Sequence, residues 1–436
     1  MLKVAYDISF LARHYRRYNF KTAGIFRVIE SLMLELNQRT SDVNLKITSA
    51  CHDHVIESLI GYILYAEDHP NIRGLNLHES FSSKAGLLEQ YSQFYDLLNP
   101  PLRKQSGYWR KHVLCGLQKI VLKGMSQFHQ IDTSPLLDRE KLDIFHSTYL
   151  RMPSKELTFG LQRAITIYDL IPIVRTDFVI KDLEVFFRNI ISSIDIDLDW
   201  AICISEYTKQ ELCEYTGMSS ERVFVTYLAA ENSFFPIIDS ILVDEVCKKY
   251  LIPENPYFLS IAALQPRKNL SFLIESFYKL ILENQNIDHN LVLAGSSGWM
   301  TEEIFETINS RPDLKHRVYF TGYVEEEDLN AIYNGATAFI FPSLYEGFGL
   351  PILEAMQAGI PVISSNATSL PEVAGDAAIL ADPQDGDAFC QAMIDIIHNS
   401  SLRQCLKCKG LEQAKKFSWD KCADQTLEAY RVISSN

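Results

Sequence analysis

The chain lacks any apolar run that approaches the roughly 18 residues of a membrane-spanning helix. It also lacks an excess of positive charge, since 41 Lys and Arg residues against 55 Asp and Glu residues give a net charge of −14. A nucleic-acid backbone demands a basic protein surface, so nucleic acid is excluded as a general partner. The P-loop and G-x-S-x-G patterns of nucleotide and serine hydrolases are missing as well.

The cysteine content argues against a secreted, disulfide-stabilised protein. Nine cysteines are scattered over 436 residues, and Cys115, Cys203 and Cys213 lie in apolar patterns typical of reduced core residues. Residues 1–7 predict a first strand rather than a signal peptide. We therefore expect a cytoplasmic globular protein, and its length favours two to three domains.

Short β-rich runs alternate with helical patterns along most of the chain. This alternation is typical of parallel sheets that are covered by helices on both faces, so the predicted fold class is α/β with two doubly wound, Rossmann-like domains. The first series of predicted strands comprises 3–7, 44–48, 143–147, 164–168, 201–205 and 223–227. The second comprises 257–262, 290–294, 318–321, 338–341, 361–364 and 378–381.

Prolines between the two series mark a predicted domain boundary. Pro236, Pro253 and Pro256 interrupt a mixed segment there. We predict an N-terminal domain over residues 1–235, a C-terminal domain over 236–415, and a separate final helical segment over 416–436. Ligands of such folds bind beyond the carboxyl ends of the strands, so the predicted active site is a cleft between the domains.

The most informative segment follows the predicted strand 338–341. Gly347 and Gly349 allow a sharp turn, and Pro351 stands where a first helical residue is expected. A helix that begins there directs its positive dipole end at an anion. Glu346 and Glu354 frame this turn, and carboxylates accept hydrogen bonds from hydroxyl groups. An anion site between two carboxylates that bind hydroxyl groups suits a nucleotide diphosphate sugar, which carries both a diphosphate and sugar hydroxyls.

These residues resemble the signature of glycosyltransferase family 4, the pattern E-G-F-G-L-P-x-L-E-A-M-x-x-G-x-P-V over residues 346–362. The resemblance implies a GT-B fold whose last helix crosses back to the N-terminal domain. It also implies a retaining, mannosyltransferase-like enzyme that moves a hexosyl unit from a GDP- or UDP-sugar to an acceptor hydroxyl. The acceptor is expected to be a glycan or a lipid-linked glycan, and neither a metal nor another cofactor is expected.

The resemblance also assigns roles in the predicted C-terminal domain. Glu346 is expected to hold the donor sugar and Glu354 the ribose, with the loop Gly347-Phe348-Gly349-Leu350 at the diphosphate. Arg267 and Lys268 form a cationic pair between a strand and a helix, which suits them to neutralise a leaving diphosphate. Many relatives carry an arginine where this chain has Ala263. Tyr323 and Val324 occupy the position of the base-binding loop.

In the predicted N-terminal domain the likeness is confined to separate pieces. Gly24 and Ile25 resemble a glycine loop that faces the donor phosphates and the acceptor. Tyr168 stands where relatives often have a sugar-contacting histidine, and Asp169 beside it is a candidate on the acceptor side. His146 ends a predicted strand that points at the cleft, so it either binds substrate or is a structural core residue.

A basic segment and two apparent metal motifs complete the candidates. Residues 100–127 contain six Lys or Arg and no acidic residue, with apolar positions at helical spacing. This segment either contacts the inner face of a membrane that contains anionic lipid or packs on the N-terminal domain. The D-x-D pattern at 195–199 and the His-Asp-His at 52–54 lack convergent partners, so no metal site is predicted.

Two other functions remain open at this point. A nucleotide-sugar epimerase or hydrolase of the same fold would use the same donor site, with a base in the cleft. A non-catalytic partner subunit would bind the donor without turnover. This alternative is motivated by three positions at which the chain differs from the family pattern, Ala23, Tyr168 and Ala263.

Overall fold

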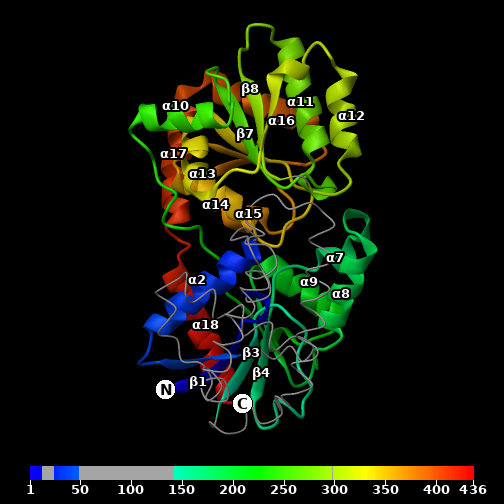
Figure 1. Cartoon of the computed structure of the whole chain (residues 1–436), viewed down its shortest axis with the longest axis vertical. Coiled ribbons are helices and arrows are strands. Elements are labelled where there is room, and N and C mark those ends of the chain that lie inside the picture. Colours follow the sequence, from blue (N-terminus) through cyan, green and yellow to red (C-terminus); the bar gives the residue numbers. More distant parts are fainter. Residues whose placement is uncertain (12–23, 49–141, 297) are drawn as a thin grey trace, which may run out of the picture.

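The computed structural model describes residues 1–11, 24–48, 142–296 and 298–436. They form two six-stranded sheets in which every pairing is parallel, stacked along the long axis of the molecule (Figure 1). The strand order is β2-β1-β3-β4-β5-β6 in the first sheet and β12-β11-β10-β7-β8-β9 in the second. Helices cover both sheets, so the predicted α/β fold with two doubly wound sheets is confirmed.

The first sheet and its helices are called the first unit. Its strands are β1 (Leu2–Asp7), β2 (Val43–Thr48), β3 (Ile144–Ser147), β4 (Gln162–Ile167), β5 (Trp200–Cys203) and β6 (Val223–Val225). Its helices are α2 (Gly24–Gln38), α7 (Ile171–Val174), α8 (Lys181–Ile191), α9 (Glu206–Thr216) and α18 (Trp419–Ser434), with 3-10 turns η3 (Thr176–Phe178) and η4 (Ser220–Arg222).

The second sheet and its helices are called the second unit. Its strands are β7 (Tyr257–Ile261), β8 (Asn290–Ala294), β9 (Val318–Gly322), β10 (Ala338–Phe341), β11 (Val362–Ser365) and β12 (Ala378–Ala381). Its helices are α10 (Ser240–Lys249), α11 (Leu270–Glu283), α12 (Glu302–Ser310), α13 (Glu326–Gly335), α14 (Leu350–Gln357), α15 (Leu370–Ala374), α16 (Gly386–His398) and α17 (Ser400–Ala414), with 3-10 turns η5 (Pro266–Lys268) and η6 (Lys315–Arg317).

Each predicted strand has a counterpart within two residues of its expected ends. The central strands are buried on both faces, and all residues of β10 are buried. This explains their near-continuous apolar sequences, which is the pattern expected of parallel strands. In the second sheet the strand order reverses between β10 and β7, and the crevice at such a switch point is the usual ligand site of doubly wound folds.

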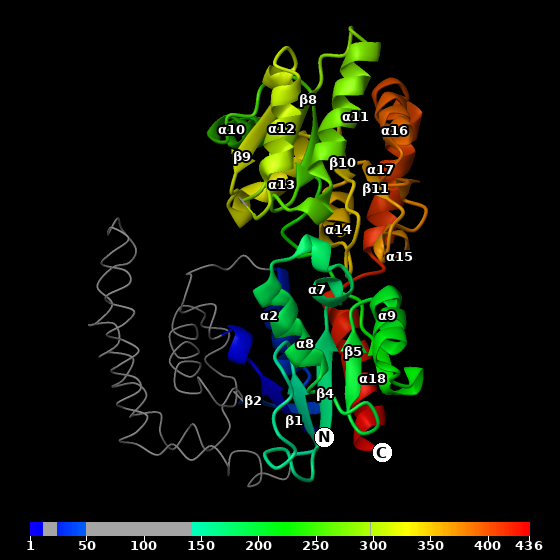
Figure 2. The same cartoon turned by 90° about the vertical axis from the view of Figure 1, so that its right-hand side faces the viewer.

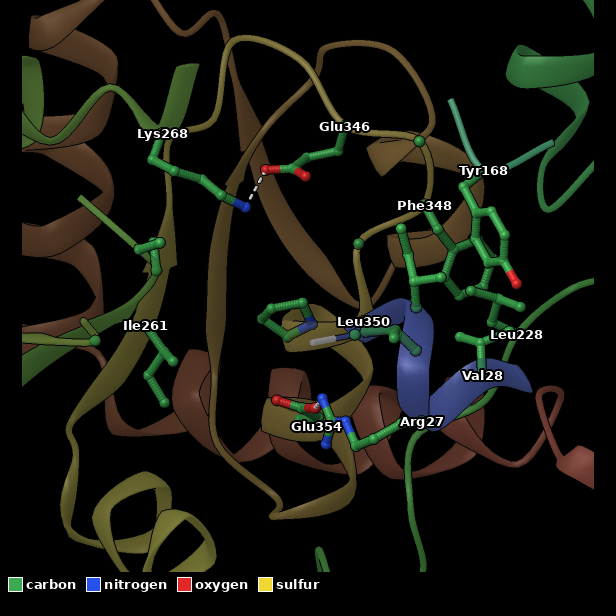
Figure 3. Close-up of a pocket in the computed structure, with 18 of the residues that line it drawn as sticks. Arg27, Val28, Tyr168, Leu228, Ile261, Lys268, Glu346, Phe348, Leu350 and Glu354 are labelled. Carbon is green, nitrogen blue, oxygen red and sulfur yellow. Dashed lines mark hydrogen bonds and ion pairs between the residues drawn. The ribbon is translucent and has the colours of Figure 1, made fainter. Parts of the chain in front are cut away.

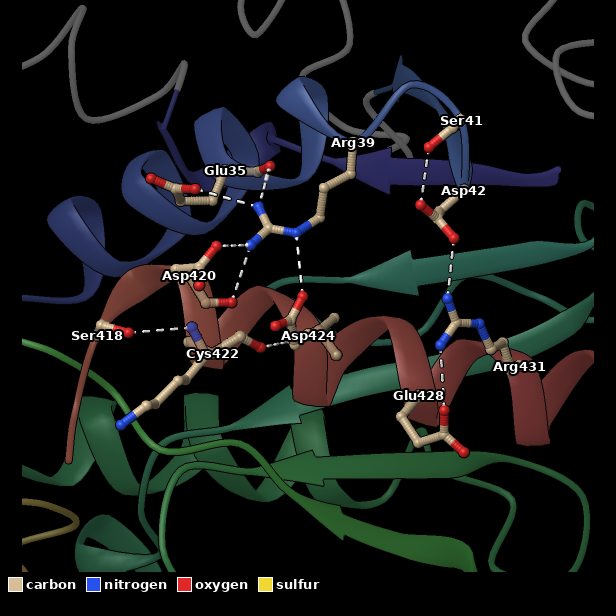
Figure 4. A network of polar contacts seen from close by, with 12 residues as sticks. Glu35, Arg39, Ser41, Asp42, Ser418, Asp420, Cys422, Asp424, Glu428 and Arg431 are labelled. Atoms are coloured by element: carbon tan, nitrogen blue, oxygen red, sulfur yellow. Dashed lines mark hydrogen bonds and ion pairs between the residues drawn. The ribbon is translucent and has the colours of Figure 1, made fainter.

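The last helix returns to the first unit. Helix α18 contacts α2, β1, β3 and β5, and Figure 2 shows it alongside the first sheet. Arg39, directly after α2, binds Asp420 at 2.5 Å, Asp424 at 3.3 Å and Glu35 at 3.1 Å (Figure 4). This network fixes α18 against α2. The boundaries at residues 235 and 415 stay predictions.

A carboxylate of the second unit caps a helix of the first. Glu372 of α15 accepts hydrogen bonds from the backbone N–H groups of Glu206 at 3.0 Å and Tyr207 at 3.2 Å, at the start of α9. The Tyr227 hydroxyl donates to the same carboxylate at 3.3 Å. A carboxylate at a helix N-terminus binds N–H groups that lack intrahelical partners, so this contact stabilises the observed arrangement of the two units.

Several sequence predictions concern residues that the structure does not describe. Within those residues, no helix combines the length and the apolar character needed to cross a membrane. The basic segment 100–127, the motif at 52–54 and Cys115 lie outside them, so the membrane contact and the cytoplasmic location stay predictions. Among the described cysteines, all free thiols, Cys203 is buried and Cys213 is half-buried, while Cys405 and Cys408 are exposed on α17 at C-x-x-C spacing.

Candidate functional site

A cavity of about 410 Å³ lies between the two units, at the carboxyl ends of strands from both sheets (Figure 3). Its volume falls in the range of small-molecule sites. The lining includes every site residue predicted from sequence except His146. These residues are Gly24, Ile25, Tyr168, Asp169, Arg267, Lys268, Tyr323, Val324, Glu346, Gly347, Phe348, Gly349, Leu350 and Glu354.

The glycine turn after β10 delivers a helix N-terminus to this cavity. Gly349 has φ +123°, a backbone conformation that residues with a side chain rarely adopt, and it directly precedes α14. Pro351 occupies the first turn of α14, and Gly359 with φ +74° follows its end. Leu350 and Pro351 line the cavity, so the positive end of the α14 dipole faces it.

Glu346 binds both cations of the η5 turn. The Arg267 Nη1 donates to Glu346 Oε2 at 2.5 Å, and the Lys268 Nζ donates to Glu346 Oε1 at 2.5 Å. The ammonium of Lys268 also lies 4.8 Å from the centre of the Phe341 ring. Because β7 and β10 are neighbours in the sheet, the loops that follow them bring these side chains together although 78 residues separate Lys268 from Glu346.

Burial and charge shift the pKa values of this cluster in a consistent way. Burial alone would raise the pKa of Glu346, but the charges of Arg267 and Lys268 outweigh it and lower that pKa to about 2. Burial and the neighbouring Arg267 lower the pKa of Lys268 to about 8, against the opposing effect of Glu346. At neutral pH the cluster therefore carries two positive charges and one negative charge, which favours an anionic ligand.

The two units are in close contact at Gly347. A Cβ atom on Gly347 would lie 2.1 Å from the carbonyl oxygen of Tyr168, so only glycine fits there without a shift. The Thr208 hydroxyl of α9 donates to the Gly347 carbonyl oxygen at 3.3 Å. The Tyr168–Asp169 loop of the first unit thus rests directly on the turn that carries Glu346.

Asp169 adds a buried carboxylate beside the cationic pair. Its Oδ1 accepts a hydrogen bond from the backbone N–H of Ile171 at 3.0 Å. Burial raises the pKa of Asp169, while the charge of Arg267 acts in the opposite direction. A carboxyl group with a raised pKa at the first-unit side of the cavity can exchange protons or accept hydroxyl hydrogen bonds.

Glu354 has partners in both units, and neither was predicted from the sequence. The Tyr333 hydroxyl of α13 donates to Glu354 Oε2 at 2.9 Å. Arg27 Nη2 of α2 donates to Glu354 Oε1 at 2.9 Å (Figure 3). Arg27 lines the cavity from the first unit. One feature of the sequence could have indicated it, because Arg27 is the only charged residue in the apolar stretch Ile25-Phe26-Arg27-Val28-Ile29.

The structure corrects the expected orientation of His146. Its side chain is fully buried in the first unit and does not line the cavity. Its Nδ1 lies 2.6 Å from the hydroxyl of Tyr430 and its Nε2 lies 2.8 Å from the hydroxyl of Thr166. Burial lowers the pKa of His146 to about 3, so it is a neutral core residue, which is the second of the two alternatives that the sequence left open.

The remaining predicted residues lie at the rim and in the adjoining loops. Tyr323 is 41% exposed, and Val324 beside it is buried. Ala263 lines the cavity, so no side-chain cation stands at the position where many relatives have arginine. Asp195 and Asp199 of the D-x-D pattern bind different cations, Lys155 and Arg163 respectively.

Comparisons with known proteins find similarity to glycosyltransferases. The family model described as "Glycosyl transferases group 1" matches residues 244–413. The O-antigen chain mannosyltransferase B of Escherichia coli is 32% identical over 334 residues, which cover 76% of this chain and 85% of that protein. The serotype-specific mannosyltransferase WbdA of Escherichia coli is 33% identical over 275 residues, but these cover 33% of its length.

Solved structures show the fold. Sucrose-phosphate synthase from Thermosynechococcus elongatus superposes with a TM-score of 0.62 and 17% identity, with full coverage of both chains. The glycosyltransferase WaaG, involved in lipopolysaccharide biosynthesis, superposes with a TM-score of 0.58 and 12% identity over 98% of this chain and 99% of that one. The fold is GT-B, as the sequence predicted.

Proposed function

This chain belongs to the glycosyl transferases group 1 family, and from that premise we propose that it transfers a mannosyl unit from a nucleotide diphosphate sugar to a hydroxyl group of a glycan acceptor. The proposal includes membership of glycosyltransferase family 4 and retention of the anomeric configuration. Support for mannose comes from the relatives, since the two compared above are mannosyltransferases.

One observation carries the proposal. Glu346, Arg267 and Lys268 form a buried cluster at the switch point of the second sheet, next to the N-terminus of α14. A diphosphate can bind the two cations and the helix end, and the developing negative charge on departure is then stabilised without a metal. The ion pairs with the same two cations hold the Glu346 carboxylate beside this diphosphate position. There it can accept hydrogen bonds from the hydroxyl groups of the sugar that is attached to the diphosphate.

The rest of the donor fits along the second unit. We place the ribose at Glu354 and the base at Tyr323 and Val324, which line the same cavity. The backbone of the loop 347–350 faces the diphosphate, which connects the ribose to the sugar.

The acceptor enters from the first unit in this account. Gly24, Ile25, Tyr168 and Asp169 line that side of the cavity. No protein nucleophile is assigned: the bond between the sugar and the diphosphate breaks, the acceptor oxygen bonds to the sugar on the same face, and the acceptor proton passes to the leaving phosphate. Asp169 orients the acceptor hydroxyl.

The test is a transfer assay with a panel of donors. The full chain is incubated with GDP-mannose, GDP-fucose, UDP-glucose or UDP-galactose and a mannooligosaccharide acceptor, with and without a chelator. We expect an elongated oligosaccharide from GDP-mannose, with unchanged yield in chelator. Epimerised or hydrolysed sugar without elongation would contradict the proposal in favour of an epimerase or hydrolase, and binding without any turnover would favour a non-catalytic subunit.

A further inference from the structure

Arg27 reaches from the first unit into the nucleotide side of the cavity. It lies near the start of α2, and its guanidinium binds Glu354 of the second unit at 2.9 Å (Figure 3). The same guanidinium lies 3.4 Å from Glu326, also of the second unit. Its side chain is 21% exposed and that of Glu354 is 4% exposed, so the closer pair is largely removed from water. The donor site of the second unit is therefore completed by a residue from the opposite unit.

The two partners of Glu354 divide its carboxylate between them. Arg27 donates to Oε1 and Tyr333 donates to Oε2, each at 2.9 Å. An ionised carboxylate offers about four acceptor positions, so one bond on each oxygen leaves about two. That number matches the 2′- and 3′-hydroxyls of a ribose. Burial raises the pKa of Tyr333 well above its usual value, so its hydroxyl stays a donor.

We propose that Arg27 is a positioning residue that fixes the carboxylate of Glu354 to receive both ribose hydroxyls, so that recognition of ribose depends on the first unit. This inference rests on the proposed function, because it assumes a nucleotide donor. Without Arg27, the Tyr333 hydroxyl is the one remaining hydrogen-bond partner of the Glu354 carboxylate within the described residues, so the carboxylate can rotate away from the ribose hydroxyls. A rotated Glu354 no longer presents its two remaining acceptor positions to the hydroxyls.

The diphosphate contacts do not depend on Arg27 in this account. Arg267 and Lys268 bind Glu346 at the other end of the cavity, whereas the ion pairs of Arg27 in the described part of the chain go to Glu354 and Glu326. Loss of Arg27 should therefore reduce discrimination for ribose more than affinity for the diphosphate. A purely structural role would weaken both to the same extent.

The experiment compares two nucleotides by isothermal titration on the full chain. The probes are a nucleoside diphosphate, GDP or UDP according to which binds wild type more tightly, and its 2′,3′-dideoxy form. Hydrogen bonds to a charged group are strong enough that the wild type should bind the ribose form about tenfold or more tightly. In Arg27→Met, which keeps an apolar stem and removes the charge, we expect this ratio to fall below about threefold.

Two further variants keep the outcome interpretable. Arg39 follows the same helix and binds Glu35, Asp420 and Asp424 away from the cavity. Arg39→Met should therefore keep the wild-type ratio of the two nucleotide affinities. Arg27→Lys retains the charge but not the planar fork, so an intermediate ratio is expected, and this variant replaces Arg27→Met if the latter does not fold.

An unchanged ratio in the Arg27 variants would overturn the inference, even if both nucleotides bind more weakly. A wild type that binds both nucleotides equally would also overturn it while leaving donor binding intact. A folded wild type that binds neither GDP nor UDP would instead overturn the proposed function, and the role of Arg27 with it.

Discussion

Replacement of Glu346 by glutamine should separate catalysis from diphosphate binding. The substitution keeps the size of the side chain but removes the charge that now lies 2.5 Å from both Arg267 and Lys268. Two cations would then remain close together without their shared partner. Removal of one partner of a buried ion pair costs about 3–5 kcal/mol, so we expect the free energy of unfolding to fall by roughly 3 kcal/mol.

The same change should have opposite effects on turnover and on nucleotide affinity. The loss of charge-assisted bonds to the donor sugar costs about 1.5–3 kcal/mol or more in the transition state, which predicts a fall in turnover of roughly 10². A diphosphate would no longer compete with Glu346 for the two cations. Glu346→Gln should therefore bind the nucleoside diphosphate at least as tightly as wild type, and more tightly at low ionic strength.

Calorimetry with the nucleoside diphosphate and a steady-state transfer assay measure the two effects on the same preparation. Glu412→Gln is a matched control, because Glu412 pairs with Lys415 on the exposed surface and should change neither quantity. A parallel loss of turnover and of nucleotide affinity in Glu346→Gln would refute the reasoning, since it would mean that Glu346 supports the diphosphate site instead of competing with it.

The other predictions concern the cationic pair. Arg267→Ala and Lys268→Ala should each weaken binding of the nucleoside diphosphate tenfold or more by calorimetry and leave binding of the nucleoside nearly unchanged; equal losses would indicate damage to the fold. Burial and Arg267 lower the pKa of Lys268 to about 8, so diphosphate affinity should be constant near pH 7 and decrease as the pH rises above about 8 and Lys268 loses its proton. Lys268→Ala should remove this decrease, whereas an unchanged pH profile in that variant would show that another group is responsible.

The sequence predicted most of the fold because parallel strands buried on both faces have a distinct pattern. The buried run of β10, Ala338-Phe339-Ile340-Phe341, ends at Pro342, and the glycine turn and Pro351 then locate the start of α14. Adjacent strands place the loops after them at one edge of the sheet, so the proximity of Glu346 to Arg267 and Lys268 also follows from local patterns.

The contacts that the sequence could not predict join distant segments. Arg27 and Glu354 are 327 positions apart, and their meeting depends on how the two units close on each other. His146 was misplaced for a related reason. A strand buried on both faces shows no alternation to indicate which way a side chain points, and the partner Tyr430 comes from α18, 284 positions away.

Stereochemistry of the transferred sugar is the most direct measurement of the central claim. Donor and product of the full chain can be compared by nuclear magnetic resonance of the anomeric proton during transfer from α-linked GDP-mannose to a mannooligosaccharide. We predict that every new linkage is α, because the acceptor attacks on the face that the diphosphate leaves. A β-linked product, or a folded and donor-saturated chain that elongates no acceptor, would contradict the account.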